Sequence, residues 1–356
     1  MSLAPRIDVL RDLAGRLPAP LDQWARTCGR TAYRLNVFAW RALSGVLRGS
    51  VLGRWTARMR VSQLWAASPE ERAKAEGMYW MGHPLVARRL RVKSSGRPDA
   101  DGYIHLKERL TAEGWRFPVA RVLSLGCGHG GLERGLASLG VAERIDGIDL
   151  SSGAIQEARR LAAEAGLGQI EYHVGDLERA DFAEGAFDIV FAHQSVHHIE
   201  DLDGLCRAVR RALRPGGIFH LNEFVGPDRF QWTDAQLHHM NAFVEALPVR
   251  FRRMPLGGVR PRPARPTIAQ MIAVDPSEAI RSSAILATVR RHFRVVEQRQ
   301  LGGALLHIGL SGIVQNFDAQ APEDVALLEA FFALEDRLMA EGVIGSDFVT
   351  LTAVRD

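Results

Sequence analysis

The sequence predicts an α/β protein with a Rossmann-like sheet, an N-terminal helical extension and a cap inserted between the fifth and sixth strands. Three observations support this prediction. From about residue 119 short apolar runs alternate with helix-length segments, a glycine-rich turn follows the first run, and an acidic residue follows each of the next two. Strands separated by helices of this length form a parallel sheet with right-handed crossovers.

The individual elements follow from the hydrophobic pattern. We expect strands at 119–125, 144–148, 170–174, 187–192, 218–224, 293–300 and 348–355. We expect helices at 132–139, 152–165, 202–213, 233–247, 304–317 and 323–341. Ser151 or Ser152 is the expected N-cap of the second helix, and Pro215-Gly216-Gly217 is expected to stop the third.

Two domains are expected in the 356 residues, which is long for one domain. Residues 1–95 read as a basic helical extension, and the linker-like stretch 94–102 leads into an α/β domain over 103–356. Within that domain the cap covers 225–290 and contains an irregular Arg- and Pro-rich segment at 248–266. The segment Asp275–Ser282 is expected to begin a helix, with Pro276 near its first position.

The composition excludes several classes of protein. No 18-residue apolar run free of charges occurs, so no membrane-spanning helix is expected. The amino terminus lacks the apolar block of a secretory signal. Three cysteines, far apart and without a CxxC motif, favour neither a disulfide framework nor a cysteine zinc site. The protein is therefore expected in the cytoplasm.

The glycine-rich turn is the most informative motif. An apolar run leads into Gly126-Cys127-Gly128-His129-Gly130, and a helix is expected to follow. Glycines permit a tight turn and a close approach of a ligand to the backbone. Asp149 and Asp176 stand at the ends of the second and third strands, where carboxylates can accept hydrogen bonds from ribose hydroxyls and from an adenine amine. Together these features predict a nucleoside-type cofactor.

With these motifs the chain resembles the class I S-adenosylmethionine-dependent methyltransferases, and NEFVGP, DPSEAIRS and the late LGGALLH resemble segments of the bacterial small-molecule and glycan type. The resemblance covers about residues 115–224 and rests on LSLGCGHG, IDGIDLS, VGDLE, FDIVFAHQSVHHI and LRPGGIFHLNE. It implies a seven-stranded sheet whose last strand is antiparallel, with S-adenosyl-L-methionine as the cofactor. By motif position the cofactor-binding residues would be Gly126, Cys127, Gly128, Gly130, Asp149, Leu150, Asp176, Leu177 and His193.

Methyl transfer to a hydroxyl group needs a base to take up its proton. His193, His197 and Glu223 stand at the ends of the fourth and fifth strands, which face the same crevice as the glycine turn. We expect His197, paired with the carboxylate of Glu223, to act as the general base. We expect His193 to lie near the sulfonium of the cofactor and His198 to be structural. A metal site made of the three histidines is not expected, because His193 should still lie in strand or turn.

The expected activity is O-methylation of a small metabolite or cell-surface glycan, and the aromatic residues Phe230, Trp232 and Phe243 are candidates for lining the acceptor pocket. Two alternatives stay open. One is a nucleic-acid methyltransferase, although the chain has His193-Gln194-Ser195-Val196 in place of an Asn/Asp-Pro-Pro-Tyr signature. The other is a protein that binds S-adenosylmethionine without transferring its methyl group.

The charge distribution suggests a further partner. Residues 1–60 hold eleven Arg, three Asp and neither Lys nor Glu, a net charge of +8, while the whole chain carries +4. Such a basic segment suits the anionic inner face of a membrane. A helical cap packed on the catalytic domain, with its Arg side chains solvated, is the competing interpretation.

Overall fold

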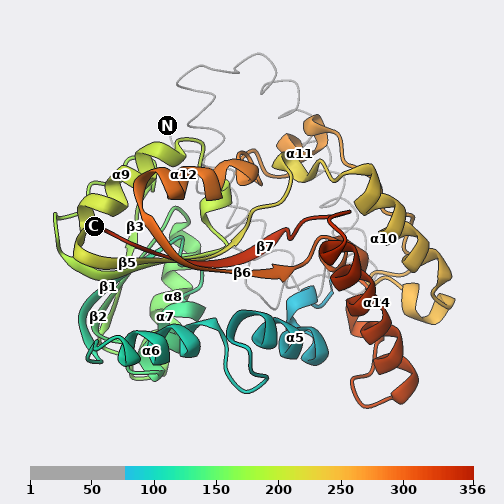
Figure 1. The fold of residues 1–356 in the computed structure, drawn as a ribbon, viewed down its shortest axis with the longest axis horizontal. Coiled ribbons are helices and arrows are strands. Elements are labelled where there is room, and N and C mark those ends of the chain that lie inside the picture. Colours follow the sequence, from blue (N-terminus) through green and yellow to red (C-terminus); the bar gives the residue numbers. More distant parts are fainter. Residues whose placement is uncertain (1–76) are drawn as a thin grey trace, which may run out of the picture. The chain divides into compact units, whose positions relative to one another are not determined.

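One mixed sheet of seven strands organises the molecule, as Figure 1 shows for the computed structural model, which describes residues 77–356. The strands are β1 (Val119–Leu125), β2 (Ala142–Asp149), β3 (Ile170–Val174), β4 (Phe187–His193), β5 (Leu213–Phe224), β6 (Arg294–Gly302) and β7 (Phe348–Val354). Their order is β3-β2-β1-β4-β5-β7-β6, and β7 runs antiparallel to both β5 and β6. The predicted Rossmann-like sheet of seven strands, with an antiparallel last strand, is confirmed.

Helices cover both faces of this sheet. They are α5 (Pro84–Ser95), α6 (Gly102–Ala112), α7 (Gly131–Ser138), α8 (Ser152–Glu164), α9 (Leu202–Ala212), α10 (Asp234–Ala246), α11 (Ile268–Val274), α12 (Ile285–His292), α13 (Leu306–Leu310) and α14 (Pro322–Ala340). In Figure 1, α9 and α12 lie above the sheet and α6 and α7 lie below it.

Alternation along the strands separates two hydrophobic cores. On β1, Val122 packs with Leu110 of α6 and Ile155 of α8, whereas its neighbour Leu123 packs with Val209 of α9 and Val289 of α12. Successive side chains of a strand point to opposite faces, so strands buried on both faces read as continuous apolar runs. This explains why the central strands were predictable from such runs.

A third core lies beside the sheet and includes residues from both ends of the described chain. Trp80, from the short 3₁₀ helix η1 (Trp80–Gly82), and Val86 of α5 pack there with Phe331 of α14 and Phe348 of β7. All described residues belong to one compact unit of the chain. Residues 80–95, assigned by the sequence to the extension, thus pack onto the sheet domain.

An ion pair fastens α5 to α14 in this region. Arg89 contacts the fully buried carboxylate of Glu335 at 3.0 Å and the partly exposed carboxylate of Asp336 at 2.6 Å. Glu335 also accepts hydrogen bonds from the backbone N–H groups of Leu305 and Leu306. The buried carboxylate is therefore fully partnered, which is the condition under which such a group is tolerated.

The segment between β5 and β6 contains α10, α11 and α12, as the predicted inserted cap requires, but two local predictions there and nearby were wrong. Helix α9 ends at Ala212 and β5 starts at once with Leu213, so Pro215-Gly216-Gly217 lies inside the strand. The stretch 275–281 forms turns and bends, and a helical segment, the 3₁₀ helix η5 (Ser282–Ala284), begins only at its end. Ala279 adopts a left-handed conformation there, with φ of 47°, and this conformation cannot continue a right-handed helix.

Candidate active site

The glycine turn joins β1 to α7, and the physical reason for glycine differs among its three glycine positions. All three have positive φ angles, 66° at Gly126, 51° at Gly128 and 74° at Gly130. A Cβ at Gly126 would collide with Ser195, and one at Gly130 would collide with the hydroxyl of Tyr172. A Cβ at Gly128 would meet nothing within 4 Å. Packing therefore requires two of the glycines, while the third borders open space.

Asp149 holds the glycine turn against the end of β2. Its Oδ2 accepts a hydrogen bond of 2.9 Å from the N–H of Gly128, and its Oδ1 accepts one of 2.8 Å from the N–H of Ser151. Ser151 caps α8 through its hydroxyl, which accepts from the N–H of Ala154. The carboxylate is half-buried, and each oxygen retains capacity for another donor. Asp149 is thus positioned at the predicted place.

The remaining predicted cofactor residues flank this arrangement. Asp176 lies just beyond β3, half-buried, and accepts from the N–H of Glu178. Leu177 packs beside the core under α9, and Leu150 is half-buried next to Asp149. Cys127 is buried, and this burial raises the pKa of its thiol, so the side chain stays uncharged.

A nucleoside cofactor fits these residues. The Cβ-free face of Gly128 leaves room for a close approach to the turn. Asp149 and Asp176 offer carboxylate acceptors at the ends of adjacent parallel strands, where ligands of open α/β sheets bind. The glycine turn would hold the amino-acid part of such a cofactor, and Asp149 and Asp176 would hold its nucleoside part.

Glu223 is the organising residue of the neighbouring turn after β4. Its side chain is fully buried at the end of β5. It accepts hydrogen bonds from the N–H groups of Ser195, Val196 and Phe224, and from Nδ1 of His197 at 2.8 Å. Burial alone would raise the pKa of Glu223, but His197 and these N–H groups lower it, so the group is a carboxylate.

His197 is held between two carboxylates in the 3₁₀ helix η2 (Val196–His198). Its Nδ1 faces Glu223, and its Nε2 lies 3.5 Å from Oε1 of Glu278. Burial acts to lower the pKa of the ring, but the attraction of Glu223 and Glu278 outweighs it and raises the pKa of His197 to about 9. The predicted pairing of His197 with Glu223 is therefore present, and the ring is cationic at neutral pH.

His193 ends β4 and points to a different partner. Its Nδ1 shares a short hydrogen bond with the hydroxyl of Tyr103 on α6. Burial keeps the pKa of Tyr103 well above its usual range, so the phenol keeps its proton and donates it. Nδ1 of His193 is then the acceptor, and in the neutral ring the proton resides on Nε2. His193 can offer that N–H to a bound group.

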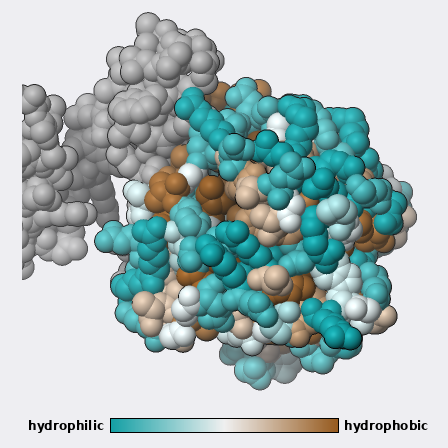
Figure 2. Space-filling model, turned by 90° about the vertical axis from the view of Figure 1, so that its left-hand side faces the viewer, coloured by the Kyte–Doolittle hydropathy of each residue, from teal (hydrophilic) through white to brown (hydrophobic). Residues whose placement is uncertain are grey.

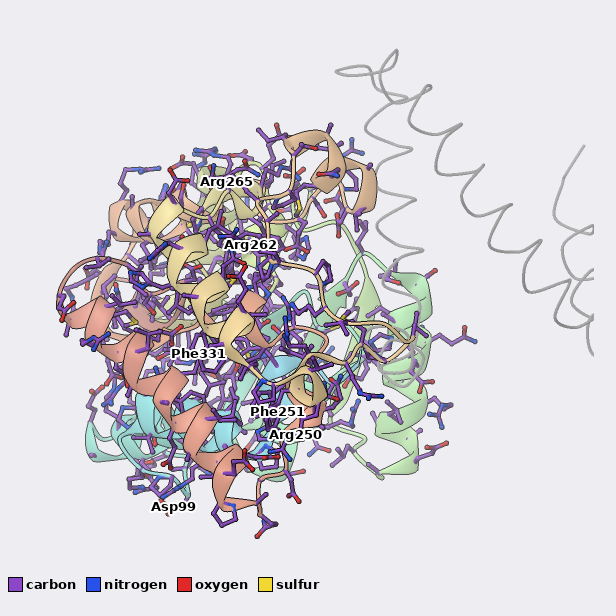
Figure 3. All side chains as sticks on the ribbon, turned by 90° about the vertical axis from the view of Figure 1, so that its right-hand side faces the viewer. Asp99, Arg250, Phe251, Arg262, Arg265 and Phe331 are labelled. Carbon is purple, nitrogen blue, oxygen red and sulfur yellow. The ribbon has the colours of Figure 1, made fainter. Side chains whose placement is uncertain are left out.

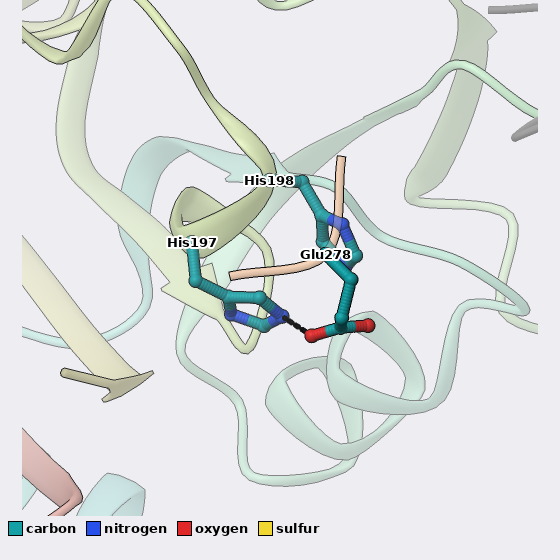
Figure 4. Close-up of side chains that lie close together, drawn as sticks. All are labelled: His197, His198 and Glu278. Carbon is teal, nitrogen blue, oxygen red and sulfur yellow. Dashed lines mark ion pairs between the residues drawn. The ribbon is translucent and has the colours of Figure 1, made fainter. Parts of the chain in front are cut away.

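Glu278, Tyr103 and Ser195 are site residues that the sequence reasoning missed. Ser195 donates its hydroxyl to the carbonyl of Leu125 at 2.7 Å and so joins the end of β4 to the glycine turn. Glu278 comes from the cap and faces both His197 and His198 (Figure 4). Its only sequence signal was its place in Asp275-Pro-Ser-Glu278, which suggested helix capping.

The aromatic residues proposed for an acceptor pocket separate into two groups. The ring of Phe230 stacks on that of Trp232, with 5.3 Å between the ring centroids. It meets the ring of Phe224, the neighbour of Glu223, edge-on, with 5.1 Å between the centroids. Phe243 instead stacks on Phe331 of α14 at 3.6 Å, inside the third core. Phe224 also meets the ring of His197, at 6.1 Å between centroids, so Phe230 is linked to His197 through Phe224.

The Arg- and Pro-rich segment of the cap is mostly engaged with the protein itself. Figure 3 shows Arg250, Arg262 and Arg265 on one side of the molecule. Arg250 pairs with Glu323, Arg262 with Glu245, and Arg265 with Asp234. Because these three cations pair with carboxylates of the protein, they are less available to bind an anionic acceptor.

Other surface features lie apart from this site. A hollow of about 550 Å³ is lined by Trp115, Arg116 and Arg214 at the amino ends of the strands, opposite to the glycine turn. On the face shown in Figure 2, hydrophobic patches lie between hydrophilic residues. Among the described residues no helix has the length and hydrophobicity needed to cross a membrane.

Comparison with known proteins identifies the central part of the chain. Residues 123–221 match a family model described as a methyltransferase domain. The chain is 34% identical over 131 residues to a malonyl-[acyl-carrier protein] O-methyltransferase of Legionella pneumophila, covering 35% of this chain and 45% of the relative. It is 31% identical over 116 residues to a sterol 24-C-methyltransferase of Eremothecium gossypii, covering 32% of this chain and 31% of the relative. The chain thus spans less than half the length of these curated relatives.

Two solved structures that resemble the chain are described as methyltransferases. A phosphoethanolamine N-methyltransferase of Haemonchus contortus in complex with S-adenosyl-L-methionine is 18% identical, with a TM-score of 0.44, over 69% of this chain and 51% of that chain. A geranyl diphosphate C-methyltransferase of Streptomyces coelicolor is 16% identical, with a TM-score of 0.46, over 84% and 98%.

The matched segment begins in β1 and ends in β5, and it includes the glycine turn, Asp149 and the turn that carries His197. The sheet order, the antiparallel β7 and the family match agree with one another. Residues 123–221 therefore form a methyltransferase domain, and the strand order of the sheet is the one that the resemblance to the class I S-adenosylmethionine-dependent family implies.

Proposed function

We propose that the protein transfers the methyl group of S-adenosylmethionine to a hydroxyl group of a small metabolite or glycan. The contact between His197 and Glu223 is the observation that supports this most directly, because a hydroxyl acceptor must lose a proton. The similarity to a malonyl-[acyl-carrier protein] O-methyltransferase also favours an oxygen acceptor.

Each residue has a distinct part in this proposal. Gly128, Asp149 and Asp176 hold the cofactor, which supplies a methyl group already activated on a sulfonium. His193 orients the bound groups through its Nε2–H, while Glu223 fixes the ring of His197 and its Nδ1 proton. The deprotonated Nε2 of His197 then takes up the acceptor proton as the methyl group is displaced in line.

Carbon methylation is the second candidate, because other relatives of the matched segment are sterol 24-C-methyltransferases. A carbon nucleophile gives up its proton after the methyl group has been added, so His197 would act later in the reaction. Nucleic-acid methylation and cofactor binding without transfer remain the alternatives, and no contact among the described residues favours either.

We also propose that residues 1–60, which lie outside the described residues, bring the enzyme to an anionic membrane surface. The support is their net charge of +8 and the presence of Trp24, Phe38, Trp40 and Trp55 among the arginines. Arginine reaches lipid phosphates while aromatic side chains enter the interface.

Release of S-adenosylhomocysteine from the full-length protein tests the proposed reaction. The panel of acceptors comprises hydroxylated glycans, phenols, a sterol and RNA, and each active acceptor is assigned by mass spectrometry of its product. Methylation of an oxygen that depends on His197 supports the proposal. Activity on the sterol carbon or on RNA alone would replace it, and cofactor binding without release on any acceptor would count against catalysis by these residues.

A further inference from the structure

Three metal-ligand side chains meet beside the proposed base. His197 and His198 come from η2, and Glu278 comes from the cap, yet one ligand atom from each lies within 4.8 Å of the others. Figure 4 shows the group, with the ion pair between His197 and Glu278 as a dashed line. The metal site considered from the sequence used His193, which lies outside this group.

Both imidazoles are oriented from their Nδ1 side. Nδ1 of His197 contacts Oε2 of Glu223 at 2.8 Å. Nδ1 of His198 contacts the hydroxyl of Ser277 at 3.0 Å, and that hydroxyl donates to Asp275 at 2.7 Å. Histidines that bind metals usually bond a carboxylate or another acceptor through the second ring nitrogen, which fixes the ring. Such partners are present for both rings.

The loop that carries Glu278 is fastened directly to η2. The N–H of Ile280 donates to the carbonyl of His197 at 3.0 Å, and the carbonyl of Ala279 accepts from the N–H of Arg229 at 2.6 Å. Ala279 is completely buried and holds a φ of 47°. A non-glycine residue keeps this conformation only where its surroundings enforce it. The position of Glu278 is therefore built into the fold.

The charges around the group suit a cation. The carboxylates of Glu223 and Glu278 flank His197, and that of Asp275 lies 4.0 Å from Nδ1 of His198. His197 supplies one positive charge there at neutral pH, and the guanidinium of Arg229 donates to the backbone carbonyl of Glu278. A bound divalent ion would displace the proton from Nε2 of His197 and add one further positive charge.

A second group of histidine and carboxylate side chains differs from the first in its ion pairs. Asp146, Glu171 and His173 also lie together, but Asp146 pairs with Arg121 at 2.7 Å and Glu171 pairs with Arg144 at 2.8 Å. Positive charge is already supplied there by the two guanidinium groups, so this second group is an ion-pair network and not a metal site.

We propose that His197, His198 and Glu278 bind a divalent transition-metal ion of the Zn²⁺ class, and that the bound ion blocks methyl transfer by occupying the base. Two histidines and one glutamate are an established set of protein ligands for zinc, and imidazole nitrogen favours zinc over magnesium or calcium. The binding step stands on the geometry alone. The inhibition step rests on the proposed role of His197 in the reaction.

Metal binding is measured first, without any enzyme assay, on untagged full-length protein competing with a chromophoric zinc indicator. We expect one high-affinity equivalent. His198→Asn and Glu278→Gln should each lower the affinity by at least about 100-fold, since even changes outside the ligand shell cost about 10–100-fold. His173→Asn, which alters the second group, is the matched control and should leave the affinity unchanged. Circular dichroism confirms that each variant is folded.

Absence of tight binding in the wild type would overturn the site. Binding that survives both substitutions would assign the ion to other groups of the chain, the cysteines included, and would also overturn it. Because the two substitutions come from different segments, a folding defect in one leaves the other as an independent test.

The second arm measures S-adenosylhomocysteine release with an active acceptor. Zn²⁺ should abolish turnover of the wild type, and a chelator should restore it. His198→Asn should remain active at zinc concentrations that abolish turnover of the wild type. Zinc that binds at this site and leaves turnover unchanged would show that His197 is not the base, whereas the metal site would stand.

Discussion

Nδ1 of His197 lies 2.8 Å from Oε2 of Glu223, and this contact joins the turn after β4 to the end of β5. The same carboxylate also accepts the N–H groups of Ser195 and Val196. Glu223 is thus committed to holding the turn and is too enclosed to meet an acceptor itself. It positions His197, whose opposite nitrogen is the reactive one in the proposed reaction.

The first prediction concerns turnover. His197→Ala should lower turnover by roughly 10²–10⁴ while the affinity for S-adenosylmethionine barely changes. Because the pKa of His197 is about 9, the wild-type rate should rise roughly tenfold per pH unit from neutral pH toward that value. Steady-state kinetics across this range, with calorimetry for the cofactor, provide the measurement. Turnover like that of the wild type in the variant would remove His197 from the reaction.

The second prediction concerns stability against pH. The pKa of His197 in the folded protein, about 9, exceeds the value of about 6.5 for an unfolded chain. Its stabilising contribution is therefore complete below about pH 6.5 and is lost as the pH rises through about 9. Urea unfolding of the wild type and of His197→Asn should show a difference in free energy that shrinks by up to about 3 kcal/mol over this range. A constant difference would contradict the ion pair.

The third prediction concerns the cofactor. Asp149→Ala should weaken binding of S-adenosylmethionine by about 1.5–3 kcal/mol, because a charge-assisted hydrogen bond is lost. The change also releases the N–H of Gly128, so the glycine turn loses its anchor. Calorimetry on the folded variant measures the effect, and Asp99→Ala, at an exposed carboxylate, serves as the control. Unchanged affinity would exclude Asp149 from the site.

The fourth prediction separates packing from ligand binding within the glycine turn. Gly126→Ala and Gly130→Ala should lower the melting temperature strongly, because the added methyl group meets Ser195 or Tyr172. Gly128→Ala should cost only about 1–2 kcal/mol of stability, from its left-handed backbone, and should lose cofactor affinity. Thermal unfolding with and without S-adenosylmethionine distinguishes the three. An equal loss of stability in all of them would contradict the open space at Gly128.

Most of the sheet was predictable because its signals are local. The strand at 119–125 and the strand at 170–174 have their predicted ends, since buried parallel strands are short apolar runs bounded by glycines or acids. The N-cap at Ser151 is also confirmed. Helix α6 was not expected, although Asp101, whose side chain accepts from the N–H groups of Tyr103 and Ile104, was a usable capping signal.

The site was only partly predictable, because the position of Glu278, which the sequence analysis did not include, depends on tertiary contacts. His197 lies in the turn directly after β4, and Glu223 lies near the end of the adjacent strand β5, so the topology brings this turn close to Glu223. Glu278 reaches them through a loop held by the bond between Ile280 N–H and the carbonyl of His197. That contact takes an N–H that a helix would have used within itself, and no local propensity anticipates it.

The fifth prediction concerns residues 1–60. Vesicles containing anionic lipid should bind the full-length protein, and vesicles of neutral lipid should not. The physical reason is that each arginine near an anionic surface contributes about 1 kcal/mol, and salt screens this attraction over a Debye length of about 10 Å at 0.1 M. Co-sedimentation should therefore decline as salt is raised. A variant lacking residues 1–60, shown by circular dichroism to be folded, should lose binding. Equal binding to neutral vesicles, or none to anionic ones, would favour the interpretation of this segment as a cap on the catalytic domain.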